Sequence, residues 1–188
     1  MLLGYHRFDD RFPGMSPFLH DLARTLAASP LGPLTRSLLR DVRGFAPIIQ
    51  TVHILSVAAV MGSVVLLDLN VLGLALRSQS TRELTRRLMP WTWWALLSLA
   101  SSGLVSLFAR PERYLLNPVF GLKFAMLVPA IVLGIVFHRV TAKNGHYWEQ
   151  SLARRASAKV VAACSLILWL GVAMAGRWIA YADYLFPQ

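Results

Sequence analysis

The sequence predicts an all-α membrane protein: a four-transmembrane-helix antiparallel bundle preceded by two short amphipathic interfacial helices. Of its 188 residues, 56% are hydrophobic and 15% are charged, whereas soluble domains usually carry about 25% charged residues. The charges lie mostly between long apolar segments, and residues 88–109 contain none. A helix needs roughly 20 mostly apolar residues to cross a bilayer, and open strands cannot cross it. Four such segments therefore indicate four spans.

An N-terminal extension, residues 1–46, precedes the bundle and contains two amphipathic segments, 16–29 and 33–43. Ser16 and Pro17 fit the cap and the first position of a helix. Both segments carry leucines on one side, and both are too short and too charged to span a bilayer. We expect helices that lie at the membrane surface or pack on the bundle, with a partly frayed tail as the alternative. Residues 1–15 lack the continuous apolar core of a cleavable signal peptide, so the first span is expected to direct insertion.

The bundle is expected over residues 47–183, with spans at about 47–76, 88–109, 117–138 and 160–182. Short loops join these spans, so consecutive helices are expected to be antiparallel neighbours. Basic residues are denser around the first and third loops than at the opposite ends of the spans. They are Arg77, Arg82, Arg86, Arg87, Arg139, Lys143, Arg154, Arg155 and Lys159, against Arg36, Arg40, Arg43, Arg110 and Arg113. The positive-inside rule then places both termini on the non-cytoplasmic side.

The formal net charge of +10 does not indicate a nucleic-acid-binding protein. The basic residues sit at the ends of apolar segments, where they anchor helices and face anionic lipid headgroups. No soluble basic domain remains to bind nucleic acid. The single cysteine, Cys164, cannot form an intramolecular disulfide, and the sequence lacks the Cys-x-x-Cys-His motif of covalent haem attachment.

Three basic-type side chains are expected at one depth of the non-cytoplasmic leaflet: His53, Lys123 and Arg177. Other polar residues lie near that level, namely Gln50, Thr51, Asn117 and Tyr181. A charged side chain inside a bilayer costs at least about 2.5–3.5 kcal/mol, so it calls for an explanation. The group would suit a quinone oxygen, a haem propionate or a lipid phosphate. Alternatively, Lys123 and Arg177 extend to the headgroups and His53 forms one interhelical hydrogen bond.

A second polar group, Asp68, Asn70 and His138, is expected in the opposite leaflet. His53 and Asp68 fall on one broad face of the first span. Pairing of Asp68 with Arg139 or with a loop arginine is the favoured interpretation, and a proton relay is the alternative.

Self-ligated haem b has limited support in the sequence. His53 and His138 lie near opposite surfaces, more than about 20 Å apart at the rise of an α-helix, so they cannot bind the same iron. His53 with Met126 or Met174 remains a conceivable ligand pair. Copper has less support, because no His pair at helical spacing and no Met-x-x-Met run is present.

Two further patterns have structural explanations. Ser98, Ser102 and Ser106 recur at four-residue spacing, which is more typical of close helix packing than of a pore. The tryptophans of the second span, Trp91, Trp93 and Trp94, fit an interfacial belt.

Several of these polar positions match the sequence pattern of a known protein family. The run H-x-L-x-x-x-x-x-x-G-S-x-x-x-x-D from His53 to Asp68 resembles the first span of a family of uncharacterised bacterial inner-membrane proteins. The same holds for Tyr114 and Asn117 before a lysine-bearing helix that ends in Phe137-His138, and for Gly176-Arg177 with Ile179-Ala180-Tyr181. A looser resemblance, to CopD and cytochrome b561-like small bundles, rests on the histidine that opens an apolar helix. The second histidine of a b561-type site has no counterpart here, so that resemblance does not imply haem.

The favoured hypothesis is a non-catalytic accessory subunit of a larger bacterial inner-membrane complex, or a homo-oligomer, with a lipid or quinone pocket at His53, Lys123, Arg177 and Tyr181. One alternative is a small redox carrier that binds haem b or quinone. The other is a proton-coupled small transporter that uses Asp68 and His138.

Overall fold

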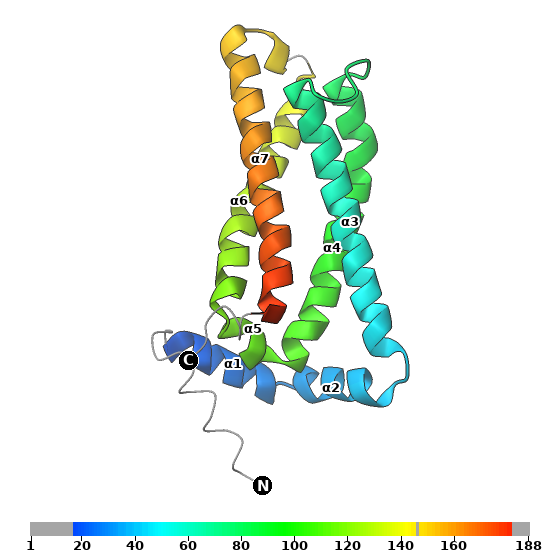
Figure 1. Ribbon diagram of the computed structural model, residues 1–188, viewed down its shortest axis with the longest axis vertical. Coiled ribbons are helices and arrows are strands. Elements are labelled where there is room, and N and C mark those ends of the chain that lie inside the picture. The colour runs from blue at the N-terminus through cyan, green and yellow to red at the C-terminus, as the bar shows by residue number, and fades with distance from the viewer. Residues whose placement is uncertain (1–16, 146, 182–188) are drawn as a thin grey trace.

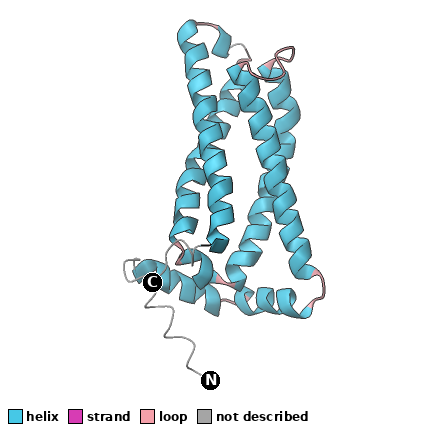
Figure 2. Ribbon diagram, in the orientation of Figure 1, coloured by secondary structure: helices cyan, strands magenta, loops and turns pink. Residues whose placement is uncertain are grey.

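The computed structural model describes residues 17–145 and 147–181, and over these residues it is helical with no strand (Figure 2). Four long helices dominate: α3 (Phe45–Leu72), α4 (Thr81–Ala109), α6 (Pro118–Lys143) and α7 (Leu152–Trp178). Each is long and apolar enough to cross a membrane. They run side by side along the long axis of the molecule, and successive helices are antiparallel (Figure 1). The predicted all-α four-helix membrane bundle is confirmed.

Two short helices, α1 (Pro17–Ala28) and α2 (Leu31–Asp41), precede the bundle and lie across one of its ends (Figure 1). α1 contacts the short helix α5 (Pro111–Leu115), and α2 contacts α3 and α4. Only a short loop between spans was expected where α5 forms. Two 3-10 helices, η2 (Tyr147–Glu149) and η3 (Ile179–Tyr181), precede and follow α7. The crosswise orientation is the one expected of amphipathic helices at a membrane surface.

Local chemistry sets the ends of the long helices. Gly44 and Gly73 flank α3 with positive φ angles of 84° and 76°, a conformation that glycine adopts without strain. α3 therefore ends at Leu72, although the apolar run continues to Leu76. At the other helices, the side chains of Ser80, Asn117 and Ser151 accept hydrogen bonds from backbone N–H groups of the first turn.

The turn between α1 and α2 is tight. Arg36 donates hydrogen bonds to the carbonyl oxygens of Ala27, at 3.0 Å, and of Gly32, at 3.1 Å. A methyl group placed on Gly32 would lie 2.8 Å from the Ala27 oxygen. Because that oxygen belongs to the backbone, it cannot move aside as a flexible side chain would.

We therefore expect Gly32→Ala to destabilise the α1–α2 pair by about 1–3 kcal/mol through steric overlap. Amide hydrogen exchange across residues 17–41 in detergent measures this directly. Gly62→Ala is the matched control, because a methyl group there meets nothing within 4 Å. Equal protection in wild type and Gly32→Ala would contradict the proposed steric requirement.

The core consists of two buried layers to which all four long helices contribute. One contains Val60, Ala95, Ala130 and Trp169; the other contains Leu67, Leu84, Met89, Phe137 and Ala158. α3 packs extensively on α4, and α6 on α7, while α3–α7 contacts join the two pairs. α4 and α6 contact each other much less. The bundle thus consists of two tightly packed helix pairs, which contact each other closely between α3 and α7 and more loosely between α4 and α6.

Candidate functional site

The α3–α4 interface contains a polar seam around His53. The Nδ1 atom of His53 lies 2.9 Å from the hydroxyl oxygen of Ser102. One turn further along α3, the hydroxyl of Ser56 donates to the Ser98 hydroxyl at 3.0 Å. Ser102 also lies 2.9 Å from the carbonyl oxygen of Ser98. When the Ser102 hydroxyl donates to that carbonyl, His53 Nδ1 is the donor to Ser102 and its Nε2 is left as an acceptor. Two serines of the four-residue repeat therefore serve helix packing.

Lys123 of α6 lies close to this seam. Its half-buried side chain points at α7, where a methyl group added to Gly176 would lie 3.7 Å from Nζ. The ammonium group acts electrostatically on His53. None of the residues that the structure describes accepts a hydrogen bond from Lys123. The structure thus brings together His53 and Lys123, which are 70 positions apart in the sequence.

Arg177 and Tyr181 form a separate, exposed pair at the end of α7 and η3. The guanidinium donates to the Tyr181 hydroxyl at 3.0 Å and lies 5.1 Å from the centre of its ring. Nearby, the buried Asn117 caps α6 and donates to the carbonyl oxygen of Ile179 at 3.4 Å. Gln50 and Thr51 are exposed. Of the seven residues at the predicted level, His53 and Lys123 face the bundle interior, and Arg177 and Tyr181 face outward.

Asn70, in the second predicted group, organises the loop between α3 and α4. Its side-chain amide donates to the carbonyl oxygens of Leu76, at 2.9 Å, and Gln79, at 3.2 Å. Its amide oxygen accepts from the hydroxyl of Thr81 at 2.8 Å. Every polar atom of the Asn70 side chain is therefore used in building this loop.

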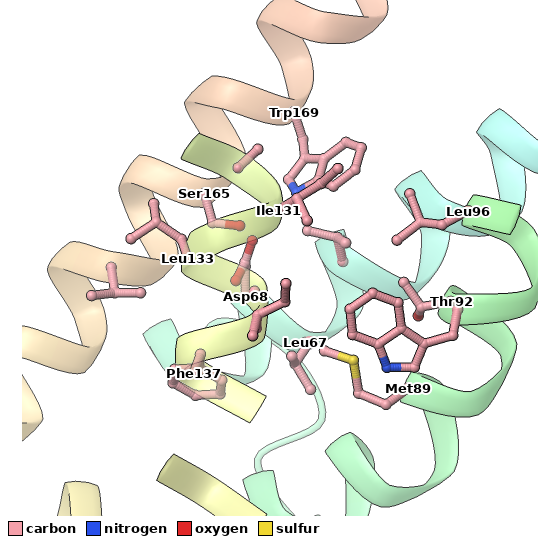
Figure 3. A pocket seen from close by; sticks show the side chains of 16 residues that line it. Leu67, Asp68, Met89, Thr92, Leu96, Ile131, Leu133, Phe137, Ser165 and Trp169 are labelled. Carbon is pink, nitrogen blue, oxygen red and sulfur yellow. The ribbon is translucent and has the colours of Figure 1, made fainter. Parts of the chain in front are cut away.

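Asp68 is in a different situation, although it lies only two residues before Asn70. Its side chain is buried, with a relative exposure of 7%. The structure places Ser165 of α7, rather than Arg139, beside the carboxyl group, and the serine side chain forms a hydrogen bond with it (Figure 3). The second carboxyl oxygen, Oδ2, is buried and has no hydrogen-bond partner among the described residues.

The same holds for Nδ1 of His138 on α6, which is buried and unpartnered within the described part of the chain. Leu67 and Phe137, the residues that precede Asp68 and His138, belong to one core layer. The acid and the imidazole therefore lie at the same level of the bundle, near the end that carries the α3–α4 and α6–α7 loops.

Asp68 lines a pocket between the two helix pairs (Figure 3). All four long helices contribute to its wall, and its volume is about 540 Å³ including the mouth. The wall is mostly apolar and includes three aromatic side chains, Trp93, Phe137 and Trp169. Trp93 is 40% exposed, so the pocket extends to the lateral surface of α4. The sequence had singled out Asp68 but not this pocket, and its only hint of Ser165 was a hydroxyl inside an apolar span.

The fold and the buried polar groups define a multi-pass helical membrane protein whose spans carry ionisable side chains. Residues 40–182 match DUF6644, a family of unknown function, and the chain belongs to that family. This confirms the expectation of an uncharacterised family. No curated protein and no solved structure matches the chain.

Proposed function

We propose that this chain is an accessory subunit of a larger bacterial inner-membrane assembly, and that it holds a lipid or a quinone at the level of His53 and Lys123. Lys123 is the observation that carries the proposal. It is a half-buried cation in an apolar helix, and no described residue supplies a hydrogen-bond acceptor for it. A charged group in such a place is stable only when it is paired or hydrogen-bonded.

A ligand with a carbonyl or phosphate oxygen would supply the missing acceptor. Gly103 and Gly176 support this reading, because neither has a side chain to fill the space beside His53 and Lys123. A methyl group on Gly103 would lie 3.8 Å from the Cε1 atom of His53. The ring of His53, whose Nδ1 donates to Ser102, would offer Nε2 as an acceptor to a hydroxyl group of the same ligand, such as a quinol O–H. Arg177 and Tyr181 would then contact the part of the ligand nearer the membrane surface.

The proposed accessory role is supported by how much of the chain the membrane spans occupy and by the two helices at one end of the bundle. The spans use most of the described chain, and α1 and α2 add a flat platform at one end of the bundle (Figure 1). Exposed apolar side chains on that platform include Phe18, Leu31 and Leu34. Such a platform suits a membrane surface or a partner subunit. The positive-inside rule supports the proposal that it lies on the non-cytoplasmic side.

The ligand part of this proposal is tested by extracting the protein gently from its native membrane and analysing the bound small molecules by mass spectrometry. We expect about one lipid or quinone per chain in wild type. Lys123→Met should reduce its yield by at least about tenfold, because the charge-assisted hydrogen bond is lost. Lys143→Met, at the exposed end of α6, is the matched control and should retain the ligand. Equal yields from the two variants, with unchanged thermal unfolding, would count against the site.

The assembly part has its own test. Native gel electrophoresis of the same extract should show the chain in a complex larger than its monomer. A monomer without partners under several mild detergents would remove this part of the proposal and leave the ligand site standing.

A redox carrier is the second function that the site supports, because Nε2 of His53 would accept a hydrogen bond from a quinol hydroxyl or bind the iron of haem b. An optical spectrum of the purified protein tests the haem form. A Soret band that disappears in His53→Ala would establish it, and a colourless, folded preparation would end it.

A further inference from the structure

The proposed function does not use the pocket at Asp68. This pocket lies at the level of the Leu67–Phe137 core layer, whereas the His53–Lys123 site lies toward the opposite ends of α3 and α6. Its single acidic group has one oxygen bonded to Ser165 and the other without a partner among the described residues. Such an unpartnered oxygen, buried and lining a pocket, needs an explanation of its own.

An ionised carboxylate in an apolar interior is costly unless a cation or several donors compensate its charge. Ser165 provides one donor, and the Oδ2 atom has no hydrogen-bond partner among the described residues. Two states satisfy the carboxyl group: a proton on the acid, or a cation beside it. The two states exclude each other, because the proton and the cation compensate the same negative charge.

The walls of the pocket favour one class of cation. Trp93, Phe137 and Trp169 line the pocket, and the rest of the lining is mainly aliphatic. Figure 3 shows Phe137 and Trp169 on either side of Asp68. The face of an aromatic ring attracts a desolvated cation. Organic cations are weakly hydrated, so they lose less hydration free energy than metal ions when they bind there. A small metal ion would need several oxygen ligands, and the pocket offers only the side-chain oxygens of Asp68, Ser165 and Thr92.

We propose that this pocket binds a lipophilic organic cation, with the Asp68 carboxylate as its counter-charge and Trp93, Phe137 and Trp169 as its aromatic wall, and that one proton leaves Asp68 for each cation that binds. Trp93 lines the pocket and is partly exposed on the lateral surface of α4, so we expect the cation to enter from the membrane. The site is independent of the proposed ligand at Lys123.

The other ionisable groups near Asp68 are few. From α7, Ser165 lines the pocket beside the acid, and from α4, Met89, Thr92 and Trp93 line it; none of them is charged. From α6, Gly134 and Phe137 line the pocket, and His138 follows at the same level. On α3 itself, the neighbouring Asn70 is engaged in the loop. Asp68 is therefore the titratable group of the pocket wall that competes directly with a bound cation, and His138 lies at the same level on α6.

The test uses benzyltrimethylammonium as the probe, in equilibrium dialysis against the full-length protein in detergent. We expect saturable binding of one probe per chain that strengthens by at least about tenfold between about pH 5 and about pH 8.5, because a proton on Asp68 blocks the site. In weakly buffered solution, binding should release protons. Neopentylbenzene, the uncharged isostere, should bind at least about tenfold more weakly.

Asp68→Asn should abolish both probe binding and proton release, while its hydrogen bond with Ser165 can still form. Trp93→Leu should weaken binding severalfold. Trp94→Leu is its matched control, since Trp94 is 69% exposed and lies outside the pocket wall. Lys123→Met should leave probe binding unchanged, which separates this site from the other one.

Three results would overturn the proposal. One is wild-type protein that unfolds cooperatively yet binds no benzyltrimethylammonium. Another is equal binding by Asp68→Asn and wild type. The third is an affinity independent of pH, or equal to that of the uncharged isostere.

Discussion

Truncation of Trp169 to alanine is expected to destabilise the bundle by about 3–5 kcal/mol, the range usual for loss of a large buried aromatic side chain. Trp169 is 5% exposed and packs in one core layer with Val60, Ala95 and Ala130, one residue from each of the other long helices. It therefore joins the α6–α7 pair to the α3–α4 pair. In a membrane, helix association depends on van der Waals packing rather than on exclusion of water, so a cavity at this point removes contacts that nothing else replaces.

Reversible unfolding in mixed detergent micelles with increasing SDS measures the effect. Trp91→Ala provides the comparison, because Trp91 is 72% exposed and belongs to neither core layer. A loss of stability for Trp91→Ala as large as that for Trp169→Ala would show that the two helix pairs are not held together through this layer.

Replacement of Asp68 by leucine is expected to act in the opposite direction and to stabilise the protein by about 1–3 kcal/mol, the usual cost of a buried polar group without a hydrogen-bond partner. Leucine has the same branched side-chain skeleton as aspartate, it needs no hydrogen-bond partner, and its neighbours in the pocket are mostly apolar. The single loss is the hydrogen bond with Ser165, whose hydroxyl can bond to its own helix. Functional positions often carry a residue that makes the folded protein less stable than an apolar residue at the same position would.

The same SDS titration measures this gain. Asp41→Leu is a suitable control, since Asp41 is exposed and bonded to its neighbour Arg40 at 2.8 Å, an arrangement that contributes little to stability. If Asp68→Leu destabilised the bundle by more than Asp41→Leu, Asp68 would have a structural partner in the membrane, and its assignment to a binding pocket would fail.

The polar residues in the spans show which features of the site could be predicted from the sequence. Asp68 and Asn70 lie two positions apart in one apolar helix, and the sequence placed them in one group. The structure separates them: Asn70 is fully bonded in the α3–α4 loop, while Asp68 faces a pocket. Two residues along a helix correspond to a rotation of about 200° around the helix axis. Two side chains that are two positions apart therefore point to opposite sides of the helix.

The group around His53 divides in a similar way. The depth of each residue followed from its distance to the end of an apolar run, because the rise of a helix is fixed. That reasoning placed His53, Lys123 and Arg177 at a common level. It gave no information on the direction of each side chain, and in the structure Lys123 points at Gly176 while Arg177 turns outward to Tyr181.

The sequence by itself determined that this protein is an all-helical membrane bundle with four spans and two short helices before them. Those properties are sums over local segments: hydropathy over a span-length window, caps and glycines at the ends, and loops too short for anything but antiparallel neighbours. Only the tertiary structure decided that α3 pairs with α4 and α6 with α7, and that Ser165 meets Asp68 in a pocket. Those features depend on how each helix is rotated about its axis, and this rotation is fixed by side-chain packing between helices that are distant in the sequence.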